Sequence, residues 1–111
     1  MIPPHVEEEI HMMTIEKNRQ GAELIVLLDG RLDTTSAPEF DAVVKNELAG
    51  VETFILDLKK LQYTSSAGLR VILLAQKTMN KQGKMILKNV AEAVMEVFEM
   101  TGLSDLLTIE S

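Results

Sequence analysis

The chain has 111 residues, of which 46% are hydrophobic and 25% charged, a composition that fits one globular domain able to bury a core. It carries 17 acidic and 11 basic residues, a formal net charge of −6 without a basic cluster, which argues against binding to nucleic acid or to an anionic membrane. The acidic charge indicates either a protein partner or solubility alone. The absence of cysteine excludes disulfides, thiolate metal sites and a cysteine nucleophile.

We expect neither a membrane-spanning segment in the sequence nor a secretory signal at its start. No apolar run reaches the roughly 18 residues of a membrane span, and MIPPHVEEEIHMM lacks a basic start and a long apolar stretch. We therefore expect no direct insertion into a membrane, and a cytoplasmic location. Residues 1–10 are rich in proline and glutamate, and we expect a flexible segment ahead of a single domain at residues 11–111.

The first two predicted elements are strands. Residues 11–17 (HMMTIEK) and 22–28 (AELIVLL) are joined by the turn signal NRQG at residues 18–21, which predicts an antiparallel hairpin. Because residues 22–28 are almost all apolar, we expect both faces of this strand to be covered.

Helices and strands alternate after the hairpin. Ser36 and Glu39 form the capping-box pattern that begins a helix, and Gly50 follows its end. A second helix begins at Ser65 and is closed by Gly83, expected at the C′ position. The other predicted elements are strands at residues 53–58 (TFILDL), 84–89 (KMILKN) and 106–110 (LLTIE), and a helix at residues 91–101 ahead of Gly102.

This order predicts an α/β fold with three to four helices and a mixed, mainly parallel sheet of four to five strands that starts with the antiparallel hairpin. Partners and ligands of such sheets usually meet the loops at the carboxyl ends of the strands. Two predicted loops qualify, residues 29–36 (DGRLDTTS) and residues 59–68 (KKLQYTSSAG).

The serines at the start of the second helix allow two interpretations. A hydroxyl of Ser65 or Ser66 can cap the unpaired N–H groups of the helix. Alternatively, one serine is phosphorylated, and the helix N-terminus stabilises the added charge. Gly68 lets the backbone approach a neighbouring strand or a partner. Arg70 lies four residues after Ser66 on the same helix face, where it meets a partner carboxylate or the phosphoryl group, or is simply solvated.

A catalytic role for Ser66 would require a base. The only histidines are His5 and His11, and TSSAG does not match the G-x-S-x-G elbow. The sequence also has no metal-ligand cluster and no Walker-type phosphate loop. We therefore expect no enzymatic activity and no cofactor.

The chain resembles a STAS domain, the module of sulfate transporters and anti-sigma factor antagonists. The resemblance covers the chain from about His11 to Ile109 and rests on GRLDTTSAPEF, FILDLKKLQYTSSAGLRVILLA, KMILKNV and VFEMTGLSDLL in this order. It implies the STAS fold and makes Ser66 the phosphoacceptor, two residues before Gly68. It also implies that Asp33 matches a second aspartate of the family and lies near Ser66.

The resemblance implies a partner-switching role. The unmodified antagonist would bind an anti-sigma factor with serine kinase activity and so free the sigma factor. Phosphorylation by that kinase would add charge that repels the partner, and a phosphatase would reset the switch. The residues expected at the partner surface are Asp33, Thr64, Ser65, Ala67, Gly68 and Arg70.

One departure from the family pattern leaves alternatives open. Ser65 stands where the antagonists carry an aspartate beside the acceptor. The loss of that aspartate would alter docking of the kinase or leave Ser65 as a competing acceptor. It also keeps open an unmodified STAS subunit that regulates a lipid-transport ABC system or a stress-sensing complex.

Overall fold

The computed structural model describes residues 13–110, so the segment predicted to be flexible, residues 1–10, and both histidines lie outside the described part. The elements are β1 (Met13–Gln20), β2 (Glu23–Leu32), α2 (Ala37–Glu47), β3 (Thr53–Thr64), α3 (Ser66–Asn80), β4 (Lys84–Lys88), α4 (Glu92–Thr101), the 3-10 helix η1 (Leu103–Asp105) and β5 (Ile109–Glu110). The predicted α/β order is confirmed.

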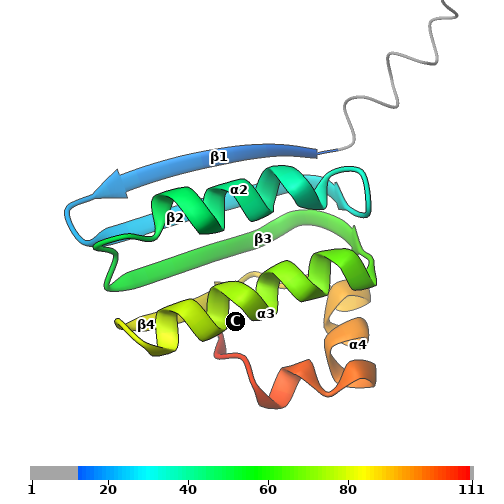
Figure 1. Cartoon of the computed structure of the whole chain (residues 1–111). Helices are drawn as coiled ribbons and strands as arrows, with labels where there is room; N and C mark the ends of the chain where they lie inside the picture. The colour runs from blue at the N-terminus through cyan, green and yellow to red at the C-terminus, as the bar shows by residue number, and fades with distance from the viewer. Residues whose placement is uncertain (1–12, 111) are drawn as a thin grey trace, which may run out of the picture.

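The sheet has the strand order β1-β2-β3-β4-β5. β1 and β2 are antiparallel, whereas the three other pairs are parallel, so the predicted mixed sheet with a starting hairpin is confirmed. α2 and α3 lie next to each other on one face of this sheet, and α4 contacts β3 (Figure 1). None of the described helices is long and apolar enough to cross a membrane.

The hairpin turn is shorter than the sequence predicted. Gln20 pairs with Glu23, so the turn consists of Gly21 and Ala22 rather than of NRQG. Gly21 has a φ of +60°, which glycine adopts at no steric cost and which the first position of a II′ turn requires. The first strand therefore continues to Gln20.

The described helices cover one face of β2. Leu24, Val26 and Leu28 are fully buried, whereas Ile25 and Leu27, which point to the other face, are half-buried. Contrary to the prediction, no helix within residues 13–110 covers the second face of β2, because successive crossovers in this strand order place α2 and α3 on the same side.

The core lies between this face and the helices. All three phenylalanines of the chain, Phe40 of α2, Phe54 of β3 and Phe98 of α4, have no exposed surface. Full burial of such a side chain contributes about 1.5–3 kcal/mol. One anchor in each of these elements therefore holds α2 and α4 to the sheet.

The glycines that follow α3 and α4 play different roles. Gly102 caps α4 with a φ of +80°, as predicted. Gly83 was predicted at the C′ position of α3, but the cap residue is Lys81 and Gly83 has no left-handed backbone. A Cβ atom at Gly83 would overlap the carbonyl oxygen of Glu52, so this glycine allows the chain to pass close to the start of β3.

Candidate functional site

The two loops predicted at the carboxyl edge are partly strand. β2 continues to Leu32 and β3 to Thr64, so the prediction that residues 29–36 and 59–68 are loops throughout was wrong. The extensions pair with each other through Asp29–Lys60, Gly30–Leu61, Arg31–Tyr63 and Leu32–Thr64. Two register shifts each give β3 one extra residue relative to β2.

The ends of the two strands are joined directly. The backbone N–H of Ser65 donates a hydrogen bond of 2.9 Å to the carbonyl of Leu32. Asp33 is the next residue after Leu32, and Ser66 is the next after Ser65. The structure therefore brings the loop of Asp33 and the start of α3 to the same point on the sheet edge.

Asp33 organises the loop that leads into α2. Its Oδ1 atom accepts hydrogen bonds from the Thr35 hydroxyl at 2.7 Å, the Thr35 N–H at 3.0 Å and the Ser36 N–H at 3.1 Å. The bond from the Thr35 hydroxyl is the largest cause that holds the pKa of Asp33 below its usual value, against the opposing effect of partial burial. The carboxylate is thus ionised and engaged by its own loop.

Ser36 does not form the predicted capping box. Its hydroxyl donates to the carbonyl of Arg31 at 2.7 Å and accepts from the N–H of Asp33 at 2.9 Å. Ser36 is the N-cap residue of α2, yet its side chain makes no hydrogen bond to that helix. The hydroxyl instead fixes the loop of Asp33 from the other side.

Three successive hydroxyl residues differ in exposure at the start of α3. Thr64 is buried, with an exposed fraction of 3%, and its hydroxyl donates to the carbonyl of Ser65 at 3.2 Å. The Oγ atom of Ser65 is buried and has no hydrogen-bond partner among the described residues. Ser66, the first residue of α3, is exposed.

Ser65 stands at the cap position of α3, but the predicted capping hydrogen bond to its hydroxyl is not formed. Its backbone is extended there (φ −94°, ψ 177°). Because Ser66 is the exposed hydroxyl of the three, it is the one that another protein can reach without local opening of the structure.

Gly68 fixes the distance between α3 and the strand ends. A Cβ atom at this position would lie 2.5 Å from Oγ1 of Thr64 and 2.6 Å from Cγ of Leu32. Of the two predicted roles, close approach to a strand is the one observed. Thr64 and Gly68 are both buried, so they position the predicted partner surface rather than face solvent.

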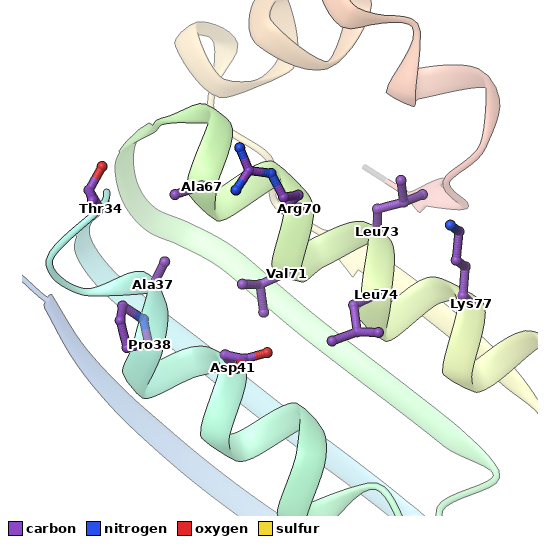
Figure 2. Close-up of a pocket in the computed structure, with 10 residues that line it drawn as sticks. All are labelled: Thr34, Ala37, Pro38, Asp41, Ala67, Arg70, Val71, Leu73, Leu74 and Lys77. Atoms are coloured by element: carbon purple, nitrogen blue, oxygen red, sulfur yellow. The ribbon is translucent and has the colours of Figure 1, made fainter.

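Arg70 stands on the rim of a groove between α2 and α3 (Figure 2). It is exposed and forms no salt bridge with the described residues. The groove has a volume of about 510 Å³ and is lined by Thr34, Ala37, Pro38, Asp41, Ala67, Arg70, Val71, Leu73, Leu74 and Lys77. Ala67, another predicted partner residue, lies at the end of the groove next to Arg70.

Sequence reasoning missed one pair of residues beside this edge. The guanidinium of Arg31 lies 4.2 Å from the centre of the Tyr63 ring, and both side chains are exposed. Both lie in the stretches expected to be loops, and only the paired strand extensions reveal that they meet. Within residues 13–110 there is no group of three or more metal-ligating side chains that could hold an ion.

Comparisons with known proteins agree on one family. A family model described as STAS domain matches residues 14–111. The Bordetella bronchiseptica protein BtrV, whose name assigns it provisionally to the anti-sigma factor antagonists, is 32% identical over 99 residues, which cover 87% of this chain and 85% of that protein.

Two solved structures have the same fold. An anti-sigma factor antagonist from Mycobacterium paratuberculosis superposes with a TM-score of 0.79 at 17% identity and covers 87% of this chain and 84% of that one. The Bacillus cell fate determinant SpoIIAA in its phosphorylated form superposes with a TM-score of 0.70 at 20% identity and covers 88% of this chain and 92% of that one.

Proposed function

Because the chain belongs to the STAS domain family, we propose that it is an anti-sigma factor antagonist controlled by phosphorylation of Ser66. The names of its relative and of its structural neighbours support the role of antagonist. The observation that carries the choice of residue is the exposure of Ser66 at the first position of α3, next to a buried Thr64 and a buried Ser65 Oγ.

The surroundings of Ser66 suit a charge switch. The first N–H groups of the 15-residue helix α3 are unpaired donors, and the helix dipole favours negative charge there. Arg70, one turn further, offers a cation on the same face. A phosphoryl group would be stable on the free protein, and its nearly two negative charges would oppose an acidic or closely packed partner surface.

The proposed partner surface surrounds this serine. It consists of Ser66, the exposed side of Ala67 and Arg70 from α3, together with the loop that Asp33 orders. The partner is an anti-sigma factor with serine kinase activity, a phosphatase restores the unmodified form, and the exchange takes place in the cytoplasm. The chain itself contributes a substrate serine and a binding surface, and no catalysis.

Phosphosite mapping tests the proposal. The purified protein is incubated with Mg-ATP and lysate of its own host, and phosphate is located by mass spectrometry in the wild type, in Ser66→Ala and in the matched control Ser65→Ala. We expect phosphate on Ser66 in the wild type and in Ser65→Ala, and none in Ser66→Ala. Phosphate on Ser65 would move the acceptor by one residue.

A negative result also has a defined meaning. If a known kinase substrate in the same lysate is labelled and this chain is not, phosphorylation is not its mode of control. The chain would then be better explained as an unmodified regulatory subunit, and a transporter ATPase or a stress-sensing complex should be recovered as its partner.

A further inference from the structure

The groove between α2 and α3 combines an apolar floor with cations on one wall. Val71 and Leu74 of α3 face α2 across it, and Leu74 is 37% exposed (Figure 2). The one carboxylate in the lining, Asp41, is paired with Lys45 at 2.9 Å. Arg70 and Lys77 form no ion pair with any residue that the structure describes. Within the described residues, the groove therefore presents apolar surface and unpaired positive charge, on a chain of net charge −6.

Such a groove fits an occupant with apolar side chains and carboxylates. The chain contains a segment of this kind directly ahead of β1. Residues 6–12, VEEEIHM, carry three consecutive glutamates between Val6 and Ile10. This segment supplies the charge that Arg70 lacks and the apolar surface that the groove floor can cover.

The attachment point of this segment lies at the correct end of the sheet. Met13 pairs with Gly30, close to the end of β2 from which the Asp33 loop leads to Thr34 and Ala37 of the groove. From Met13, the groove lies about two strand spacings across the sheet and one layer above it. The straight-line distance is about 14 Å.

The segment reaches the end of the groove beside Arg70 more easily than the end beside Lys77. Glu9 and Glu7 stand four and six residues before Met13, which allows spans of about 13 and 20 Å. Lys77 lies two helical turns beyond Arg70, about 10 Å further along the groove. The length of the segment therefore favours Arg70, because only a fully extended segment would bring a glutamate to Lys77.

We propose that residues 6–12 of this chain dock into the end of the groove beside Arg70. The glutamates face Arg70, and Val6 and Ile10 cover the apolar floor. A single exposed ion pair is weak, but a short tether keeps the segment at an effective concentration in the millimolar range. This inference does not depend on phosphorylation of Ser66 or on any partner protein.

A paramagnetic label on the full chain tests the docking. Because the chain has no cysteine, the variant His5→Cys carries a nitroxide at one defined position. The broadening of each backbone amide is then measured by NMR on dilute, ¹⁵N-labelled protein. We expect the strongest broadening at Ala67, Val71 and the residues between them.

Charge variants test whether the glutamates of the segment face Arg70. Arg70→Gln, and separately the triple change of Glu7, Glu8 and Glu9 to Gln, should lower the docked population about two- to five-fold, the range that an exposed ion pair allows. Lys77→Gln is the matched control and should lower the docked population less than Arg70→Gln does. The amide spectrum of each variant confirms that it is folded.

Three outcomes would overturn the proposal. Broadening spread evenly over the surface would show that the groove is not the docking place. Equal losses in Arg70→Gln and Lys77→Gln would show that the occupant is not limited by this tether. Broadening that vanishes on dilution or on mixing with unlabelled protein would assign the segment to the groove of a second copy.

Discussion

The change Gly68→Ala tests whether close packing of α3 on the strand ends sets the position of Ser66. The new Cβ atom would lie 2.5 Å from Oγ1 of Thr64 and 2.6 Å from Cγ of Leu32. Thr64 and Leu32 have exposed fractions of 3% and 0%, so neither side chain can turn into solvent to make room. The helix start must shift, or the core around it must be strained.

The expected cost is the difference between two opposing effects. Overpacking of a well-filled core costs about 1–3 kcal/mol. Replacement of glycine by alanine stabilises a helix by at most about 1 kcal/mol, and by less in the first turn, where Gly68 stands. We expect a net loss of about 1–2 kcal/mol, which lowers the Tm by about 4–8 °C in a domain of this size.

Urea titration and calorimetry measure this loss, and a second variant identifies its cause. Thr64→Ala removes the nearest atom, so the double variant should lose about 1 kcal/mol less than the sum of the two single variants. Phosphorylation of Ser66 should slow in Gly68→Ala and recover in the double variant. A stable Gly68→Ala, or strictly additive losses, would refute the reasoning.

Three further variants test the surrounding groups. Ser65→Ala removes a buried hydroxyl without a partner, so by urea titration we expect the free energy of unfolding to stay equal or rise by up to about 1 kcal/mol; a loss of about 1 kcal/mol would instead indicate a capping serine. Asp33→Asn should cost about 1 kcal/mol at pH 7, and because the folded-state pKa is lowered, the advantage of the wild type should disappear as the pH falls below 3.8; an unchanged difference at low pH would contradict this. Ser66→Asp should stabilise the start of α3 by about 0.3–1 kcal/mol and weaken binding to the anti-sigma factor at least about tenfold, a loss of about 1.4 kcal/mol; in pull-down titrations, affinity equal to that of Ser66→Ala would count against the charge switch.

Regular patterns in the sequence predicted the parts of the fold that depend on periodicity. In β3, alternation places Phe54, Leu56 and Leu58 on the buried face, and the strand was predicted over exactly this stretch. Beyond it the buried residues are Leu61 and Thr64, each three positions after the last. A spacing of three does not indicate a strand, so residues 59–64 were predicted as a loop.

The register shifts explain this change of spacing. Each shift adds one residue to β3 and returns the next buried side chain, Leu61 or Thr64, to the covered face after three positions instead of two. Pairing with a partner strand decides whether such a residue is tolerated, and the local sequence does not contain that information.

The side-chain contacts at the helix starts were beyond prediction for a related reason. Ser36 and Glu39 match a capping box, but the Ser36 hydroxyl can also bond with groups that precede it. The carbonyl of Arg31 and the N–H of Asp33 take that hydroxyl once β2 extends to Leu32. The pattern located the helix correctly, whereas the direction of the side chain depended on the strand extension.

The same register shifts decide where the candidate site stands. Glu23 pairs with Thr53 and Leu27 with Asp57, whereas Leu32 pairs with Thr64, two residues further along than a constant offset would give. Without the extra residues, Leu32 would lie opposite Gln62, and the start of α3 would run about 7 Å past the end of β2.

That displacement would separate the parts of the site. The N–H of Ser65 would lose the carbonyl of Leu32, and Gly68 would no longer pack between Leu32 and Thr64. The loop of Asp33 and the exposed hydroxyl of Ser66 would then stand at different levels of the sheet edge. The two extra residues of β3 therefore bring the proposed acceptor and the ordered acidic loop to one surface that a partner can cover.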